Sequence, residues 1–247
     1  MIYIFLPAYN EAVALPRVVG KFSEELKKHS LPFKFVVLDD GSKDATASVA
    51  SDLSSRYPLE LLKHPVNLGL GATLKDGIEH LARITRDEDL VVMLDCDDTH
   101  EPEFLPAALD KIDQGYDVVL LSRFCPGGGS GNLAPIRKML SMGAGLFLKI
   151  FFPIKGVREY SCCYRVFRAS ILKKGMDRFG KDFIRLPHMG FVAAPEILVR
   201  MRMLNARIIE SPFTLRYEQK PGLSKNKPLK TIAGYFALVA LYFGKKA

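Results

Sequence analysis

Two aspartates, Asp95 and Asp97, follow directly after an apolar stretch at residues 90–94. Such a stretch predicts a buried strand of a parallel sheet, and open α/β sheets bind ligands outside the carboxyl ends of their strands. Two carboxylates at this spacing can hold one Mg²⁺ ion, which prefers a few carboxylates together with phosphate oxygens. The pattern is compatible with a clamp for a metal ion and a diphosphate, although D-x-D alone is common. A solvated acidic turn that caps a helix beginning near Pro102 would give the same sequence.

Two other predicted strands also end in polar side chains. The polar residues are Tyr9, Asn10 and Glu11 after the strand 2–6, and Asp39 and Asp40 after the strand 33–38. Because the carboxyl ends of parallel strands share one edge of a sheet, these residues are expected to meet the aspartate pair there. We also expect Asn10 to cap the helix that follows it.

Glycines follow the third predicted strand and fill a later loop. Gly69 and Gly71 could let the backbone approach a ligand, or they could serve only to pack a helix against a strand. Residue 74 is leucine, so the G-x-G-x-x-G pattern of a dinucleotide site is absent. Residues 125–132, CPGGGSGN, could order over a substrate or could be a plain linker.

Strands and helices alternate strictly in the first half of the chain. The predicted strands are 2–6, 33–38, 59–63, 90–94 and 117–121, and helices lie between them. This order predicts an α/β fold with a Rossmann-like, mostly parallel central sheet flanked by helices. After it the expected elements are a helix at 137–153, strands at 164–167 and 207–215, and helices at 190–204 and 231–243. We expect one domain over residues 1–247, with a donor and metal half at 1–121 and an acceptor half at 122–247.

The net charge of +8 conceals two halves of opposite sign. Residues 1–135 carry 13 Lys and Arg against 21 Asp and Glu, a net charge of −8, whereas residues 136–247 carry 22 against 6, a net charge of +16. The basic half suits phosphate groups or anionic lipid, and no RNP-like or aromatic–basic motif favours nucleic acid. Four cysteines, two of them adjacent, indicate a reducing, cytoplasmic compartment. No apolar run reaches the ~18 residues of a membrane span.

Several motifs, in this order, resemble family-two glycosyltransferases of the GT-A fold. They are LPAYNE at 6–11, VLDDGSKDAT at 37–46, NLGLGA at 67–72 and LDCDDTHEP at 94–102. Others resemble dolichyl-phosphate and polyprenyl-phosphate sugar (mannose) synthases more narrowly. They are SRF at 122–124, GGG after it, RK at 137–138, YRVFR at 164–168 and GLSK at 222–225.

The resemblance implies an inverting transfer of a sugar from GDP-mannose or a UDP-hexose to a polyprenyl or dolichyl phosphate, with Mg²⁺ or Mn²⁺ as cofactor. It assigns the metal to Asp95 and Asp97, and catalysis to Asp97 and Arg123. The implied nucleotide-binding residues are Pro7, Tyr9, Glu11, Asp39, Asp40, Gly71 and Asp95. The implied acceptor-phosphate residues are Arg123, Arg137, Ser141 and Lys225.

The chain departs from the family pattern at a few positions. Thr99 stands where a frequent glutamine would supply a third metal ligand, and Gln219 replaces an arginine before the GLSK motif. Arg216 or Lys220 would then have to substitute for that arginine.

A lipid acceptor would place the enzyme at the cytoplasmic face of a membrane, as a peripheral protein. The apolar segments 139–154 and 232–243 are too short to span a bilayer, so they would lie in the interface, or else they are core helices. Three other functions fit part of the pattern. One is a transferase with a soluble hydroxyl acceptor, another is a phospho-receiver that uses Asp39 or Asp40, and the third is a nucleotide-binding protein without activity.

Overall fold

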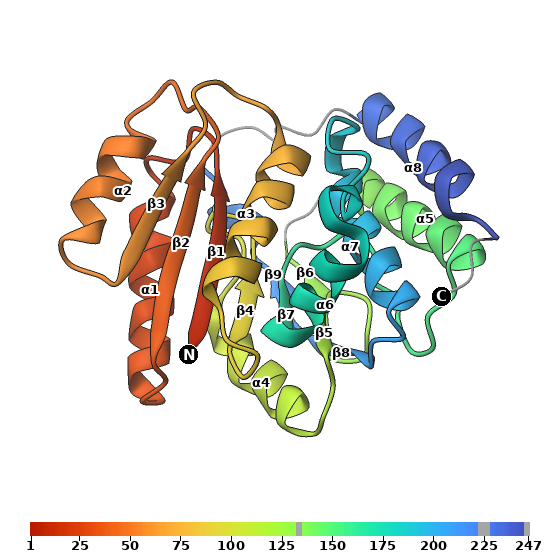
Figure 1. Cartoon of the computed structure of the whole chain (residues 1–247), viewed down its shortest axis with the longest axis horizontal. Coiled ribbons are helices and arrows are strands. Elements are labelled where there is room, and N and C mark those ends of the chain that lie inside the picture. The colour runs from red at the N-terminus through yellow and green to blue at the C-terminus, as the bar shows by residue number, and fades with distance from the viewer. Residues whose placement is uncertain (132–134, 222–227, 245–247) are drawn as a thin grey trace.

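The structure, a computed structural model, describes residues 1–131, 135–221 and 228–244, and for residues 135–137 it describes the backbone alone. Within these residues the main sheet has seven strands in the order β3-β2-β1-β4-β7-β5-β8, of which β7 is antiparallel to its neighbours (Figure 1). The strands are β1 (Ile2–Ala8), β2 (Phe33–Asp39), β3 (Leu59–Lys63), β4 (Leu90–Met93), β5 (Val118–Ser122), β7 (Arg165–Arg168) and β8 (Ile208–Pro212). The predicted mostly parallel α/β sheet is confirmed.

Helices cover both faces of this sheet. They are α1 (Leu15–Lys28), α2 (Thr46–Ser54), α3 (Leu70–Ile84), α4 (Leu105–Asp113), α5 (Pro135–Phe151), α6 (Ala169–Phe179), α7 (Ala193–Met203) and α8 (Pro228–Tyr242), with short 3₁₀ turns η1 (Pro102–Phe104), η2 (Gly180–Asp182), η3 (Gly190–Val192) and η4 (Tyr217–Gln219). The apolar sides of α1, α2 and α4 pack on one face, and those of α3, α6 and α7 pack on the other.

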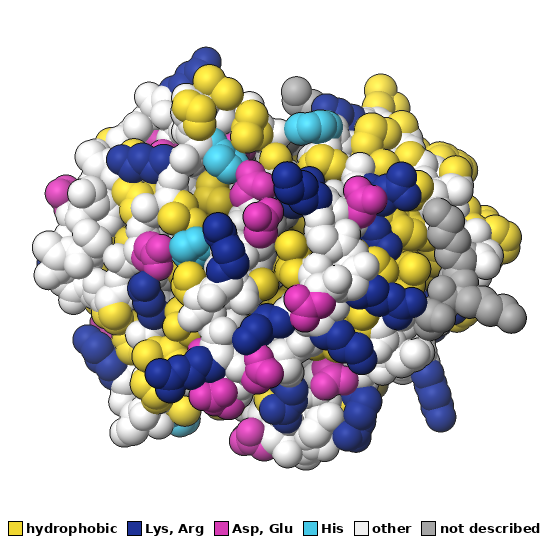
Figure 2. Space-filling view, in the orientation of Figure 1, with side chains coloured by type: hydrophobic (Ala, Val, Ile, Leu, Met, Phe, Trp, Pro, Cys, Tyr) yellow, Lys and Arg dark blue, Asp and Glu magenta, His cyan; other side chains and the backbone are white. Residues whose placement is uncertain are grey.

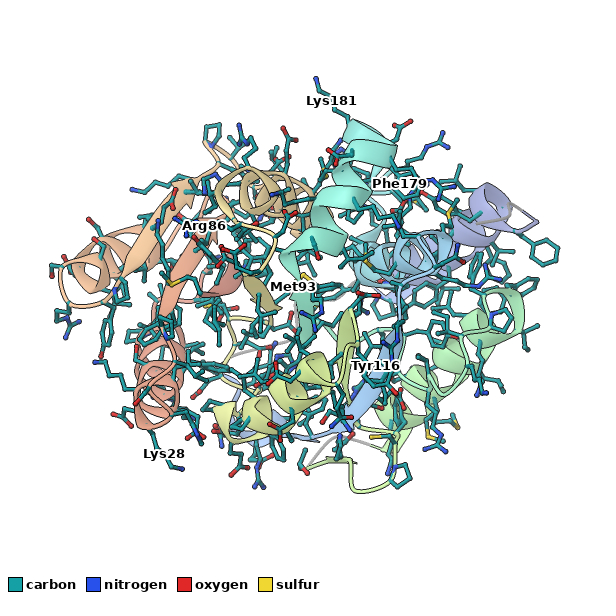
Figure 3. All side chains as sticks on the ribbon, turned by 60° about the horizontal axis from the view of Figure 1, so that its bottom comes forward. Lys28, Arg86, Met93, Tyr116, Phe179 and Lys181 are labelled. Atoms are coloured by element: carbon teal, nitrogen blue, oxygen red, sulfur yellow. The ribbon has the colours of Figure 1, made fainter. Side chains whose placement is uncertain are left out.

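Side-chain alternation along the strands fills the two layers of the core. On β1, Ile4 and Leu6 pack under α1, whereas Phe5 packs on the opposite face under α3. Met93, at the end of β4, is buried between the sheet and its helices, whereas the charged Lys28 and Lys181 are exposed and point outward (Figure 3). The sheet is therefore buried on both faces, and its carboxyl edge carries the polar residues.

The helices α5 and α8 lie side by side at one end of the molecule (Figure 1). The rings of Phe147 and Phe236 join them, with 5.2 Å between centroids. Tyr235, Leu238 and Tyr242 anchor α8 in the core, because all three are buried against the layer formed by α7. No helix in the described residues is both long enough and apolar enough to cross a membrane.

Several expectations about single elements need correction. Strand β7 inserts between β4 and β5, which strict alternation did not predict, and the helix α6 that follows it was not predicted either. The helix expected at 190–204 is divided into η3 and α7 by the non-helical backbone of Phe191.

The loop and strand expectations also changed. The strand expected at 207–215 is divided into β8 and a short β9 (Thr214–Leu215). β9 pairs with β6 (Gly129–Ser130), so part of the glycine loop is ordered against the chain. Asn10 does not cap α1, because α1 begins at Leu15 and the Asn10 side chain accepts the backbone N–H of Lys43 at 2.8 Å.

Candidate active site

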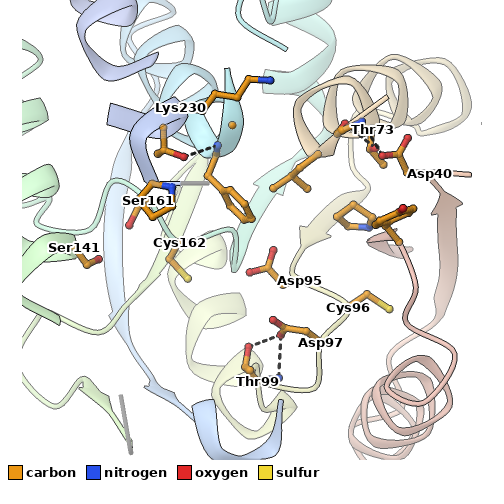
Figure 4. A pocket seen from close by; sticks show the side chains of 18 of the residues that line it. Asp40, Thr73, Asp95, Cys96, Asp97, Thr99, Ser141, Ser161, Cys162 and Lys230 are labelled. Atoms are coloured by element: carbon orange, nitrogen blue, oxygen red, sulfur yellow. Dashed lines mark hydrogen bonds between the residues drawn. The ribbon is translucent and has the colours of Figure 1, made fainter. Parts of the chain in front are cut away.

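The polar ends of β1, β2 and β4 meet at one edge of the sheet, as predicted. β1 and β2 are in register at Ala8 and Asp39, and β4 runs beside β1 on its other side. A cavity of about 1030 Å³ lies over this edge. The predicted site residues that line it are Pro7, Tyr9, Glu11, Asp40, Asp95, Asp97, Arg123 and Ser141. Figure 4 looks into this cavity, with Asp40 on one side, Ser141 and Ser161 on the other, and Asp95 and Asp97 between them.

Asp40 organises the loop that leads into α3. Its Oδ1 accepts the backbone N–H of Leu68 at 2.9 Å and contacts Nδ1 of His64 at 2.8 Å. Its Oδ2 accepts the side-chain amide of Asn67 and the backbone N–H of Gly69, at 2.9 and 2.8 Å. The carboxylate therefore shapes the cavity wall by fixing a loop.

Asp39 and Gly71 do not line the cavity. Asp39 is buried, and its carboxylate accepts the backbone N–H of Ser42 at 3.1 Å. At Gly71, an added Cβ would lie 2.2 Å from the carbonyl oxygen of Pro187. Close packing of α3 against Pro187 therefore requires a glycine at residue 71, and its role in nucleotide binding stays a prediction. Gly69, with φ +93°, does line the cavity at the start of α3.

The two aspartates of the predicted metal site have different surroundings. Oδ1 of Asp97 accepts the hydroxyl of Thr99 at 2.6 Å, and Oδ2 forms an ion pair with Nζ of Lys220. Burial by itself would raise the pKa of Asp97, but Lys220 outweighs it and the pKa is lowered. Burial raises the pKa of Asp95, and the negative charge of Asp97 adds to this effect.

His100 supports the acidic turn from below. Its Nδ1 accepts the backbone N–H of Asp95 at 3.2 Å, and its ring stacks on Tyr164 with 5.1 Å between centroids. Burial of the ring lowers the pKa of His100, which favours the neutral form. Because Nδ1 accepts a hydrogen bond, the proton of that neutral form is on Nε2. The sequence showed five scattered histidines and gave no reason to select this one.

The donor atoms at this edge suit a divalent cation that also binds phosphate. No group of three or more His, Cys, Asp or Glu side chains in the described part of the chain could hold a metal by itself. Mg²⁺ however needs only one or two carboxylates when a substrate diphosphate supplies further oxygens. Asp95 and Asp97 both line the cavity, and the carboxylate of Asp97 is already paired with a cation, the ammonium group of Lys220. The donor set therefore fits the predicted ion.

Arg123 lies in a second cluster of polar residues in the same cavity. Its Nε donates to Oε2 of Glu159 at 2.7 Å, and its Nη2 donates to Oε1 of Glu159 at 2.9 Å. Nη2 also contacts the hydroxyls of Ser141 and Ser161, at 3.2 and 3.3 Å. Although burial disfavours both charges, their attraction raises the pKa of Arg123 and lowers that of Glu159. Sequence reasoning had selected Arg123 and Ser141 but not Glu159 or Ser161.

Two predicted acceptor residues stay predictions. Arg137 lies in the first turn of α5, where its side chain is outside the described part, and Lys225 is outside the described residues altogether.

Comparison with known proteins gives the family. The family model for glycosyl transferase family 2 matches residues 3–176. The chain belongs to this family. Membership leaves no support for the phospho-receiver alternative, because the match spans both the aspartate pair and Arg123.

Two curated relatives and a solved structure are similar to the chain. The chain is 28% identical over 233 residues to a dolichol-phosphate mannosyltransferase of Pyrococcus furiosus. The alignment covers 94% of this chain and 60% of the relative. This chain therefore spans about three fifths of that relative's length. It is 29% identical over 225 residues to a polyprenol monophosphomannose synthase of Mycolicibacterium smegmatis, covering 90% of this chain and 79% of the relative.

The solved structure is a glucosyl-3-phosphoglycerate synthase from Mycobacterium tuberculosis in complex with Mn²⁺, UDP and glucosyl-3-phosphoglycerate. It matches with a TM-score of 0.63 and 19% identity, covering 97% of this chain and 80% of that one. This likeness shows the fold, and the family-2 chain has the GT-A glycosyltransferase fold.

Proposed function

We propose that this family-2 glycosyltransferase moves a hexose from GDP-mannose or a UDP-hexose to a polyprenyl or dolichyl phosphate, with inversion at the anomeric carbon. The observation that carries the proposal is the continuity of two cavities. The cavity at the sheet edge, which holds the aspartate pair and Arg123, adjoins an apolar groove of about 270 Å³ between α5 and α8. The residues that line both are Leu140, Ala144, Ile232 and Tyr235. A substrate with a phosphate head and a hydrocarbon tail matches this change of polarity.

The donor diphosphate belongs at the aspartate end of the cavity. Asp95 and Asp97 would hold Mg²⁺ or Mn²⁺, which would neutralise the charge that develops on the leaving nucleoside diphosphate. Tyr9 and Glu11 line the neighbouring wall, next to the loop that Asp40 fixes, and are proposed to contact the nucleoside.

The acceptor phosphate belongs beside Arg123. A phosphomonoester is already an anionic nucleophile, so the site needs cationic positioning rather than a general base. Glu159 neutralises much of the Arg123 charge but also holds the guanidinium in one orientation, next to the hydroxyls of Ser141 and Ser161. Arg137 in the first turn of α5, and Lys225, are proposed to add the remaining positive charge.

The outer surface of α5 and α8 is proposed to dock on the cytoplasmic face of a membrane. Exposed apolar side chains gather there, and Figure 2 shows them as the yellow area over this end of the molecule. They are Met139, Leu140, Met142, Leu146 and Ile150 on α5 and Leu229, Ile232 and Phe236 on α8, with Phe243 just after it. Helices that expose such residues beside a strongly basic half of the chain suit the headgroup region of an anionic bilayer. This favours the interfacial alternative for both segments over the core alternative.

A transfer assay tests the proposal. Undecaprenyl phosphate in detergent would be incubated with radiolabelled GDP-mannose or UDP-glucose, with Mn²⁺ or with EDTA, and the organic phase would be counted. We expect label in the lipid with one donor, and its loss with EDTA. Transfer of label to a water-soluble acceptor, with none to undecaprenyl phosphate, would replace the lipid acceptor by a hydroxyl acceptor.

A further inference from the structure

Lys220 forms an ion pair with Asp97, one of the two aspartates that the proposed function assigns to a metal ion. Its Nζ is paired with Oδ2 of Asp97, and the two side chains are only 15% and 12% exposed. Water therefore screens this pair poorly, and an ammonium group held there is stabilised mainly by the carboxylate. A divalent cation bound to the same carboxylate oxygen would lie close to the Lys220 ammonium group and would repel it strongly.

The backbone around Lys220 is fastened to the acidic turn. The N–H of Arg216 donates to the carbonyl of Thr99 at 3.0 Å. The side-chain oxygen of Gln219 accepts from Nζ of Lys21 at 2.7 Å. The same Lys21 nitrogen donates to Asp98 and Glu101, at 2.9 Å each. Residues 216–220 are thus tied at several points to the turn that carries Asp97.

We propose that Lys220 is a built-in counter-cation, which pairs with Asp97 until metal and donor bind together and then pairs with the donor diphosphate. The inference rests on the proposed metal site. The ties at residues 216 and 219 keep the Lys220 backbone in place, so only its side chain has to move. Lys220 lines the same cavity as both aspartates, so a diphosphate bound there would lie within its reach.

This exchange makes metal and nucleotide binding interdependent. A metal ion that enters alone must break the ion pair and leave a largely buried ammonium without its partner. When the metal enters with a nucleoside diphosphate, the diphosphate replaces Asp97 as that partner. By linkage, each ligand then increases the affinity for the other. Lys220 is accordingly a positioning residue for the donor as well as a competitor of the metal.

The experiment measures Mn²⁺ binding to the full chain, from the electron paramagnetic resonance signal of free Mn²⁺, with and without GDP or UDP. Without nucleotide, Lys220→Gln is expected to bind Mn²⁺ about tenfold more tightly than the unsubstituted protein, within the usual range of coupling between sites. With Mn²⁺ saturating, the same variant is expected to bind the nucleotide several-fold more weakly. Lys220→Arg keeps the charge and should resemble the unsubstituted protein in both measurements.

Matched variants separate the ion pair from general charge. Lys230 also lines the cavity, at its other end in α8, so Lys230→Gln removes one positive charge without touching the pair. It should leave Mn²⁺ affinity within about twofold, as expected for an exposed charge. Gln219→Ala keeps Lys220 but removes the hydrogen bond from Lys21 to residue 219. It should increase Mn²⁺ affinity, as Lys220→Gln does.

Different results overturn different parts. If Asp97→Asn abolishes Mn²⁺ binding while Lys220→Gln and the unsubstituted protein bind equally, the metal site stands and the role of Lys220 is wrong. If Asp97→Asn leaves Mn²⁺ binding unchanged with and without nucleotide, the metal site is wrong and the inference fails with it.

Discussion

Glu210 on β8 holds the backbone of Glu159 through a single carboxylate oxygen. Its Oε1 accepts the N–H groups of Arg158 and Glu159, at 2.6 Å each. Glu159 in turn holds Arg123, whose side chain is only 9% exposed. The edge strand β8 thereby fixes the cation that is proposed to bind the acceptor phosphate.

Replacement of Glu159 should damage acceptor use more than donor use. Glu159→Gln keeps the size of the side chain but removes the charge that orients Arg123. We expect the KM for polyprenyl phosphate to rise about tenfold while nucleotide affinity is unchanged, since misplacement of a binding group costs at least this much. Loss of the buried pair should also cost about 3 kcal/mol of folding free energy. Glu88→Gln, at an exposed ion pair, is the control. Equal effects on donor and acceptor would contradict this role.

The same ion pair predicts how stability depends on pH. The pKa of Glu159 is lowered in the folded protein from its ordinary value of 4.5, because Arg123 outweighs the effect of burial. A lowered carboxyl pKa contributes stability above the unfolded value, and this contribution is lost as pH falls through the folded value. The melting temperature should therefore fall with acidification below about pH 4.5 less steeply in Glu159→Gln than in the unsubstituted protein. Parallel curves from calorimetry would show that the pair does not contribute.

Loss of Asp97, the proposed metal ligand, should impair turnover. Asp97→Ala removes an anionic ligand and leaves the repulsion of the diphosphate uncompensated, so we expect activity to fall by at least ~10². Asp113→Asn changes an exposed aspartate at the end of α4 and should have no effect. Near-normal turnover of Asp97→Ala in excess Mn²⁺ would remove the clamp from the mechanism.

The effects of the two arginines proposed to bind the acceptor should be separable from effects on the donor. Arg123→Ala and Arg137→Ala are expected to weaken the use of polyprenyl phosphate by about tenfold or more and to spare nucleotide binding, because charge-assisted hydrogen bonds to phosphate are lost. Arg123→Ala would also leave Glu159 buried without its partner, so its folding must be checked by circular dichroism. Loss of nucleotide binding with intact acceptor affinity, in a folded variant, would place these residues at the donor instead.

The proposed membrane surface can be tested without disturbing the core. Deletion of residues 231–247 would remove Tyr235, Leu238 and Tyr242 from the core, so substitutions of exposed residues are better. Ile150→Glu and Phe236→Glu change side chains that are 66% and 61% exposed, and each should reduce sedimentation with anionic liposomes several-fold.

Salt and a matched apolar residue provide the controls for this surface. Val13→Glu, at a site 59% exposed near α1, should have no effect on liposome binding. High salt should release part of the bound protein, because electrostatic attraction is screened. If the unsubstituted protein does not sediment with anionic liposomes at ~50 mM salt, where the Debye length exceeds 10 Å, a soluble acceptor becomes the better hypothesis.

The sequence alone determined the platform of the site. The strands β1, β2 and β4 are short apolar runs that end in polar residues, and both features depend on the local order of side chains. Parallel strands bring those ends to one edge, so Tyr9, Asp40 and the aspartate pair could be expected together before any coordinates. The motifs that resemble the family are also local, because each is a short run of neighbouring residues.

Only the tertiary structure decided how the polar groups are paired. Lys220 and Asp97 are 123 positions apart, and Glu159 and Arg123 are 36 apart. A lysine or a glutamate in a loop carries no local pattern that names its partner, because such a pair depends on which loops the packed sheet brings together. The antiparallel β7 illustrates the same limit, since residues 164–167 predict a strand but not its direction. Periodicity depends on residues that are neighbours in the chain. A buried charge is different, because water is excluded around it and it must be paired with an opposite charge that the fold brings close.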